Sequence, residues 1–218
     1  MYMGVNVGND NLLIVTIMDE NRVVQSINKF WKEGFLWFVE HTNPKIISMD
    51  AAIILNRHMT QAEAQLQVFE RKNPKIVPPR VRLATELTQI LRENYHFEIA
   101  NEDTVNDKSK KLVARTFPDA FYKKFIRREL LPPDTREGLE QRLYNLPKTG
   151  VVYKKEVLEE SDKKFLRRRL SSIICAFCSY SIDKGTIEIY GDKEEEQIII
   201  PKYKFVPKKD RYVLQENT

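Results

Sequence analysis

Cysteine, glycine and long apolar runs are all scarce in this chain of 218 residues. Its two cysteines cannot cross-link a fold of this size, so a hydrophobic core has to stabilise it. The longest apolar stretches, such as Ile173–Phe177, are far shorter than the roughly 20 residues that span a bilayer. The first residues, Met1–Val7, lack the basic and apolar regions of an export signal. We therefore expect no membrane partner and a reducing, cytoplasmic location.

Charge, in contrast, is abundant. Lysine and arginine number 36 against 31 aspartates and glutamates, which gives a formal net charge of +5 and a pI near 9.0. With 42% hydrophobic and 31% charged residues, the composition is typical of a globular protein, and the length favours a single domain over 1–218. A positive balance is compatible with a nucleic-acid partner but does not by itself demonstrate one.

The N-terminal part of the chain alternates short strands with turns. We expect strands at 3–7, 12–17 and 23–27. Their connections are so short that neighbouring strands have to run antiparallel. A fourth strand is expected at 45–49, and it ends at Asp50. In an open α/β sheet, ligands and catalytic groups collect at that carboxyl end, so Asp50 is a candidate site residue.

Helices dominate the remaining sequence. The first is expected to pack an apolar face on the sheet, formed by Trp31, Phe35, Phe38 and Val39. Further helices are expected at 60–71, 81–95, 119–128, 135–144 and 161–182. Further strands are expected at 111–117, 186–190 and 198–200. This order predicts one domain with a helical insertion at about 60–160.

Three antiparallel strands, a helix and a strand that ends in aspartate form the opening of the RNase H fold. The chain resembles an uncharacterised family of predicted archaeal and bacterial nucleases that have this fold. The resemblance lies in Gly4–Asn6, Met49–Ala52, Arg115–Pro118 and Ser171–Tyr180. These segments are similar to the family's Gly-apolar-Asp, Asp-Ala-Pro, Glu-x-aromatic/His-Pro and a helix beginning Asp-Ala-Leu. The resemblance implies an α/β, RNase H-like mixed sheet with additional helices and a C-terminal strand pair.

The same resemblance implies hydrolysis of phosphodiesters by two divalent metals, Mg²⁺ or Mn²⁺, held by carboxylates. It puts the family's acidic cluster at Asn6, Asp50, Arg115 and Ser171. Only Asp50 is still an acid, so it is the one metal ligand expected here. An amide and a hydroxyl carry no charge, and a guanidinium repels a dication. We therefore expect a nucleic-acid-binding relative of these nucleases with weak or lost metal-dependent hydrolysis, and with no cofactor if it is inactive.

Two alternatives remain open. In the first, the protein is an active nuclease whose acids come from other positions. Asp119 is one helical turn beyond Arg115, whereas Asp10 would need an unusual loop to reach the site. Asp162 is roughly 13.5 Å from Ser171 along the last helix at 1.5 Å per residue. In the second, the fold is a protein-interaction scaffold without catalysis. A homo-oligomer is compatible with either alternative.

Basic side chains cluster along several predicted helices, most densely at Lys163–Arg169. Such a cluster is commonly a solvated helix face. Its place beside the expected active face favours instead contacts with nucleic-acid phosphates, which need charge and no base readout. The side chains expected to make these contacts are Arg57, Arg80, Lys123, Arg167, Arg168 and Arg169.

A C-x-x-C pair, Cys175 and Cys178, occurs in the last helix. Such a pair can indicate a redox site or half of a zinc site. The chain has three histidines and no second cysteine pair, whereas structural zinc takes four Cys or His ligands. Because the surrounding helix is apolar, we expect both thiols to be buried as small hydrophobic side chains.

Overall fold

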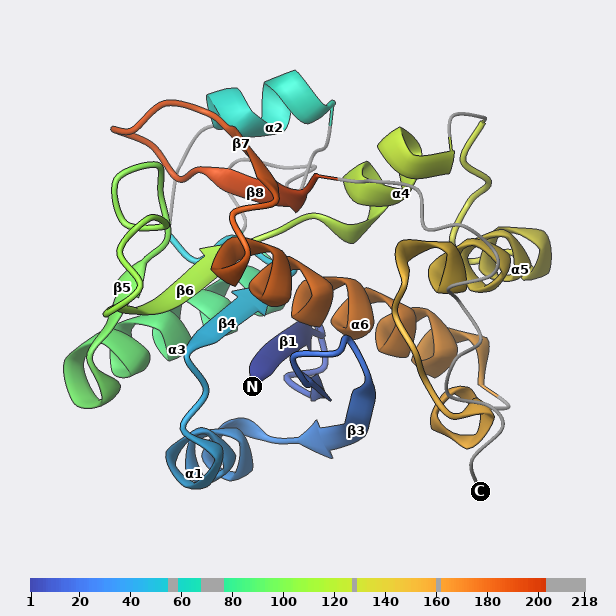
Figure 1. Ribbon diagram of the computed structural model, residues 1–218, viewed down its shortest axis with the longest axis horizontal. Coiled ribbons are helices and arrows are strands. Elements are labelled where there is room, and N and C mark those ends of the chain that lie inside the picture. The colour runs from blue at the N-terminus through green and yellow to red at the C-terminus, as the bar shows by residue number, and fades with distance from the viewer. Residues whose placement is uncertain (55–58, 68–76, 127–128, 160–161, 203–218) are drawn as a thin grey trace.

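A computed structural model gives the fold as one mixed sheet covered by helices (Figure 1). It describes residues 1–54, 59–67, 77–126, 129–159 and 162–202. The protein is therefore of the α/β class, as the sequence predicts. No helix in these five described ranges is both long enough and apolar enough to cross a membrane.

Within the described ranges, eight strands make up the sheet. They are β1 (Tyr2–Val7), β2 (Leu13–Met18), β3 (Val24–Phe30), β4 (Ile46–Met49), β5 (Phe97–Ile99), β6 (Lys111–Arg115), β7 (Ile187–Tyr190) and β8 (Ile198–Pro201). Their order is β3-β2-β1-β4-β6-β8-β7, and β5 also pairs with β6. The first three strands are antiparallel, and β4 lies parallel to β1 and to β6. The antiparallel pairing predicted for the first three strands and the mixed character expected of the sheet are thus confirmed.

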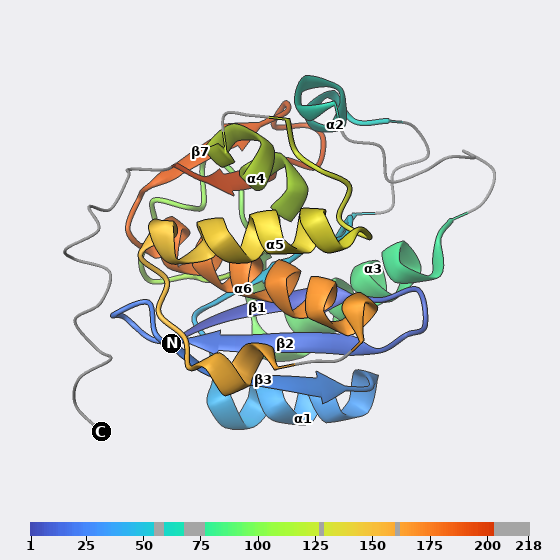
Figure 2. The ribbon, with the colours of Figure 1, turned by 90° about the vertical axis from the view of Figure 1, so that its right-hand side faces the viewer.

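In the described part of the chain, six α-helices and two 3₁₀ turns surround this sheet. They are α1 (Lys32–Thr42), α2 (Gln61–Leu66), α3 (Pro79–Tyr95), α4 (Pro118–Ile126), α5 (Arg136–Asn145) and α6 (Lys163–Asp183), with 3₁₀ turns at Leu146–Thr149 and Lys155–Leu158. Figure 2 shows α5 and α6 on one side of β1–β3 and α1 on the other. Each face of the sheet therefore has its own apolar core.

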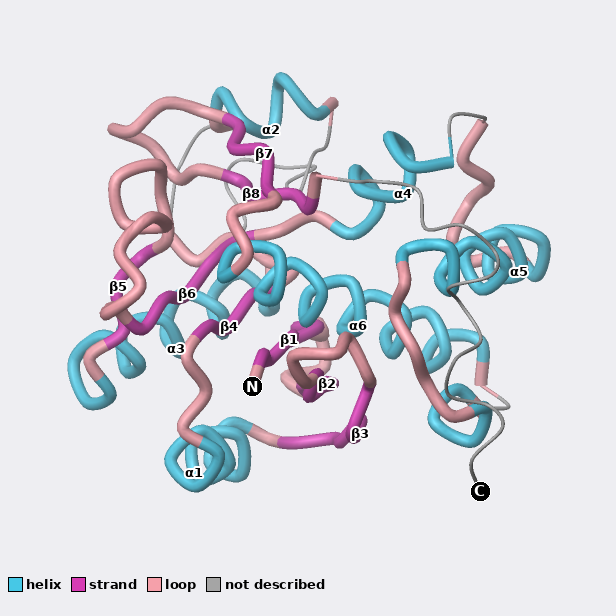
Figure 3. Tube along the Cα trace, viewed as in Figure 1, coloured by secondary structure: helices cyan, strands magenta, loops and turns pink. Residues whose placement is uncertain are grey.

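The segment 60–160, predicted as a helical insertion, also contributes two strands to the sheet (Figure 3). β6 is central, because it lies between β4 and β8. β5 was not expected from the sequence, since three residues are too few to establish an alternating pattern. The sheet thus continues through this segment, and the added helices lie around it.

The first helix buries part of its predicted apolar face. Phe35 and Val39 are fully buried, and Phe38 is half-buried against the same core. Trp31 is instead 60% exposed, contrary to the prediction that it packs on the sheet. It occupies the N-cap position with extended backbone, so helical spacing does not govern where its ring lies.

The helix α6 approaches β1 unusually closely. A Cβ atom on Gly4 would lie 2.0 Å from the backbone nitrogen of Ala176 and 2.2 Å from the carbonyl oxygen of Ser172. Hydroxyl groups satisfy the polar atoms along this contact, since Ser179 donates to the carbonyl oxygen of Met3 at 2.8 Å. The close approach brings the side chains of α6 over the carboxyl ends of β1 and β4.

The two cysteines are buried, as the sequence predicts. Both are free thiols with no exposed surface, and the Cys178 thiol donates to the carbonyl oxygen of Ile199 at 3.3 Å. Burial raises the pKa of Cys178 to about 11. The pair therefore packs as small hydrophobic residues in the core between α6 and the sheet.

Candidate functional site

A cavity of about 360 Å³ lies at the carboxyl ends of β1 and β4. The turn after β1, the starts of α3 and α4, and the N-terminal half of α6 form its walls. The polar residues that line it are Asn6, Asn9, Asp10, Asp50, Arg80, Asp119, Lys164, Arg167, Arg168 and Ser171. Three of the four positions predicted to form the acidic cluster therefore meet here, namely Asn6, Asp50 and Ser171.

The alternation of side chains along the strands brings Asn6 and Asp50 together. Even-numbered residues of β1 and β4, such as Tyr2 and Ile46, pack on the side of α6, and odd-numbered residues face α1 and α3. Val5 is in register with Met49, so the next residue of each strand points toward α6 at the same level. The two side chains are joined directly, because the Asn6 amide donates to Asp50 Oδ2.

Asp50 is held from several sides at once. Its Oδ1 accepts a hydrogen bond of 2.8 Å from the backbone N–H of Val7. The Arg80 guanidinium donates to the backbone carbonyl of Asp50 and lies 3.4 Å from the carboxylate. Only 5% of Asp50 is exposed, so these contacts replace most of its hydration.

The guanidinium of Arg168 occupies the other side of Asn6. Its Nε donates to Asn6 Oδ1 at 2.7 Å, and its Nη1 lies 3.0 Å from Asp10 Oδ2. A further hydrogen bond goes to the backbone carbonyl of Leu12. Burial lowers the pKa of Arg168, although Asp10 and Asp50 oppose that shift. The side chain is 7% exposed and is therefore a buried cation with defined partners.

Asp10 reaches the cavity, although the sequence favoured its exclusion. The turn after β1 folds back, with the backbone N–H of Gly8 donating to the carbonyl oxygen of Leu12 at 3.0 Å. Burial raises the pKa of Asp10, but Arg168, backbone N–H groups and Lys164 together hold that pKa below its usual value. The carboxylate therefore stays ionised as the counter-ion of Arg168.

Arg115 does not join the other three residues, contrary to the prediction. It is odd-numbered on β6 and in register with Met49, so it points to the face of the sheet opposite α6. Only 1% of it is exposed, and it forms ion pairs of 2.6 Å with Glu63 and with Glu196. The residue that follows β6 is Thr116, which points to the α6 side by the same alternation and whose N–H donates to the Met49 carbonyl oxygen.

The ion pairs of Arg115 stabilise the segment that follows Asp50. Glu196 accepts hydrogen bonds from the backbone N–H groups of Ile53 and Ile54, the second at 2.9 Å. Glu63 also accepts from the N–H of Thr60 and completes the N-terminal cap of α2. Arg115 is therefore a structural residue of this side of the sheet and does not contact the cavity.

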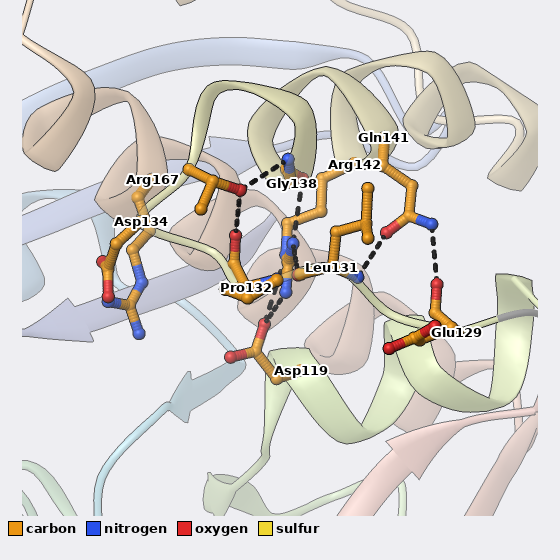
Figure 4. Close-up of polar contacts among 10 residues, drawn as sticks. Asp119, Glu129, Leu131, Pro132, Asp134, Gly138, Gln141, Arg142 and Arg167 are labelled. Atoms are coloured by element: carbon orange, nitrogen blue, oxygen red, sulfur yellow. Dashed lines mark hydrogen bonds and ion pairs between the residues drawn. The ribbon is translucent and has the colours of Figure 1, made fainter.

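A second polar network includes Asp119 and Arg167, two residues that line the cavity (Figure 4). Arg142 donates to Asp119 Oδ1 at 2.9 Å and to the backbone carbonyls of Leu131 and Gly138. Asp119, the substitute acid that the sequence favoured, thus lines the cavity but is already paired. Arg167, in turn, donates to Asp134 Oδ1 at 2.5 Å. This pair ties α6 to the loop before α5.

The six basic residues predicted to contact phosphate have different positions. Arg80, Arg167 and Arg168 line the cavity. The others do not share this position. Arg169 donates to the carbonyl oxygen of Glu159, Lys123 donates to Gln67, and Arg57 lies outside the described residues. Lys164, which sequence reasoning did not single out, lines the cavity with 67% of its side chain exposed. Its place one turn before Arg168 is the signal that was missed.

The donor set does not fit the divalent metal that the resemblance implies. Asp50 is the one carboxylate among the three matched positions, and both of its oxygens already accept hydrogen bonds. A guanidinium is bonded to Asn6, where it would repel a dication. Among the described residues, no three His, Cys, Asp or Glu side chains form a group suited to a metal ion. Mg²⁺ needs hard, charged oxygen ligands.

Comparison of the chain with family models, with curated proteins and with solved structures found no match. Functional inference therefore depends on the geometry of the cavity. That geometry consists of one buried carboxylate, two guanidinium groups bonded to it or to its neighbour, and two partly exposed cations on the wall.

Proposed function

We propose that the chain has an RNase H-like fold, is related to the predicted nucleases that it resembles, and binds nucleic acid with weak or lost hydrolysis. The strand order β3-β2-β1-β4-β6, with three antiparallel strands before the parallel ones, supports the fold. The meeting of Asn6, Asp50 and Ser171 at one cavity supports the relationship. Both rest on the sequence resemblance and on this topology.

One observation carries the functional proposal: positively charged side chains of the protein already neutralise Asp50, the buried carboxylate of the cavity. Arg80 and Arg168 lie on opposite sides of the Asp50–Asn6 pair. A phosphodiester that enters the cavity is then attracted by these cations. No metal is needed to offset repulsion between the phosphate and a cluster of carboxylates. Binding is retained in this arrangement, whereas the charge that would bind an activating metal is mostly lost.

Lys164 and Arg167 are the side chains best suited to contact phosphate. They lie three residues apart on α6, and 67% and 39% of their side chains are exposed. Their partners are Asp10 at 3.5 Å and Asp134 at 2.5 Å. Such exposed ion pairs contribute only about 0–1 kcal/mol, so a phosphate replaces the carboxylate partner at little cost.

The double variant Lys164→Ala/Arg167→Ala tests this assignment. We expect it to bind a fluorescently labelled single-stranded oligonucleotide roughly tenfold or more weakly than the parent chain, in titrations run between about 50 and 200 mM salt. The slope of log K against log salt is expected to fall by about 2, one for each phosphate contact removed. Fluorescence anisotropy titrations of the full chain measure both quantities for DNA, for RNA and for a duplex.

Lys123→Ala is the matched control, because it removes an exposed lysine that bonds Gln67 and does not line the cavity. We expect its affinity to stay within about twofold of the parent chain, since it removes no phosphate contact. Equal losses of affinity in the control and the double variant would show that the binding surface does not lie at the cavity. Absence of binding at low salt would favour the scaffold alternative. Capture of a protein partner that persists after nuclease treatment would then support that alternative.

An active nuclease is a second candidate, favoured by one observation. Asp10 and Asp119 line the same cavity as Asp50, so three carboxylates surround it. All three already have arginine partners: Arg80 for Asp50, Arg168 for Asp10 and Arg142 for Asp119. Cleavage of an oligonucleotide in Mn²⁺ that disappears in Asp50→Asn would establish this candidate over the non-hydrolytic one.

A further inference from the structure

Two ion pairs of the cavity are joined through the amide of Asn6 in one series of contacts. Arg80 lies 3.4 Å from Asp50, and Asp50 accepts a hydrogen bond from the amide of Asn6. The same amide accepts from Arg168 at 2.7 Å, and Arg168 pairs with Asp10 at 3.0 Å. Each negative group therefore has a cation of the chain within ion-pair reach, and the amide of Asn6 joins the two halves.

We propose that the Arg168 guanidinium is the built-in counter-cation of this cluster and takes the place of a divalent cation. If positions 6 and 171 carried carboxylates, removal of Arg168 would open a site for such a cation. The inference rests on the contacts of Arg168 and does not require that nucleic acid bind. Arg168 is then one cause of the misfit between the donor set and a divalent metal, beside the missing carboxylates at positions 6 and 171.

Three features of Arg168 support this role. Its side chain is only 7% exposed, so it contributes a fixed charge and not a mobile surface cation. Its donors are directed to an amide, a carboxylate and a backbone carbonyl, which come from β1 and from the turn after it. It precedes Ser171 by three residues on α6, so both residues occur on the same side of the helix.

On the side of Gly8, the space beside the guanidinium is closely filled. A Cβ atom on Gly8 would lie 2.3 Å from the Arg168 Nη2 atom and 2.2 Å from Asp10 Oδ1. A cation added beside Arg168 would therefore meet both the positive charge and the atoms that surround it. Removal of the side chain frees this space and also leaves Asp10 and Asp50 without a neutralising group between them.

Titration calorimetry with Mn²⁺ as the only ligand tests the proposal. The conversion variant is Asn6→Asp/Arg168→Ser/Ser171→Asp, and its matched control is Asn6→Asp/Ser171→Asp, which keeps Arg168. We expect the conversion variant to bind one Mn²⁺ at least about tenfold more tightly than the control or the parent chain, a difference of about 1.4 kcal/mol. Equal affinity of the control and the conversion variant would overturn the proposal.

Thermal unfolding with and without Mn²⁺ covers the case in which the conversion variant does not fold alone. Metal binding then supplies the missing charge, so we expect Mn²⁺ to restore its folded state and to raise the Tm of the control less than that of the conversion variant. A conversion variant that stays unfolded in Mn²⁺, or a control whose Tm rises as much as that of the conversion variant, would contradict the proposal. These titrations contain no nucleic acid, so their failure is distinguishable from failure of the proposed function.

Discussion

Replacing Arg168 with methionine is expected to lower the free energy of unfolding by about 3 kcal/mol or more. The substitution keeps most of the side-chain length but leaves Asn6, Asp10 and the Leu12 carbonyl without their donor. Asp10 then loses its buried cation and keeps the largely exposed Lys164 at 3.5 Å, while Asp50 keeps Arg80 at 3.4 Å. Urea unfolding followed by circular dichroism at neutral pH measures the change.

Arg167→Met is the matched control for this variant, since the two arginines are neighbours on the same helix. Arg167 is 39% exposed on its side chain and pairs with the largely exposed Asp134. Its loss is expected to change stability by less than about 1 kcal/mol. The same control is expected to weaken nucleic-acid binding. Equal stability losses at the two positions would mean that Arg168 is an ordinary surface cation.

Substituting Gly4 with alanine is expected to remove about 3 kcal/mol or more of stability, which is the upper range for overpacking a core. The new Cβ would lie 2.0 Å from the Ala176 nitrogen and 2.2 Å from the Ser172 carbonyl oxygen, and both atoms are backbone. The contact cannot be relieved by a side-chain rotation, so α6 has to move away from β1. That movement also displaces the α6 side chains that line the cavity.

Gly34→Ala is the control for the glycine substitution, because Gly34 lies within α1 and away from α6. Its added Cβ would meet a ring carbon of Phe30 at 3.3 Å, which is a side-chain contact able to adjust. Helix propensity favours alanine over glycine by about 1 kcal/mol. We expect the stability of this variant to be unchanged or slightly raised. A Gly4→Ala protein as stable as this control would show that β1 and α6 are packed less closely than described.

Most of the fold was predictable because it is encoded locally. The strands β1 to β4 follow from turns and β-branched residues, and the position of Asp50 follows from the end of β4. The resemblance also predicted Asn6 and Ser171 beside Asp50, and all three line one cavity. The strand positions depend on local patterns in the sequence, whereas the choice of Asn6 and Ser171 depends on the resemblance.

The remaining features depend on long-range packing. The position of Arg115 depends on the register between β6 and β4, and a one-residue difference moves a side chain to the opposite face. Asp10 reaches Arg168 because the turn after β1 folds back on Leu12. No local pattern distinguishes Arg168 from the arginines on either side of it. Its burial depends on which side of α6 packs against β1, and this packing is set only when the chain folds.

The dependence of nucleic-acid binding on divalent metal tests the central claim most directly. Anisotropy titrations of the parent chain are to be run at constant ionic strength in EDTA, in Mg²⁺ and in Mn²⁺, with the oligonucleotide analysed on a gel afterwards. We predict the same affinity in all three conditions within about twofold and an intact oligonucleotide, because Arg80 and Arg168 already supply the positive charge. Binding that is tightened roughly tenfold or more by Mg²⁺ or Mn²⁺, or cleavage that Asp50→Asn removes, would contradict it.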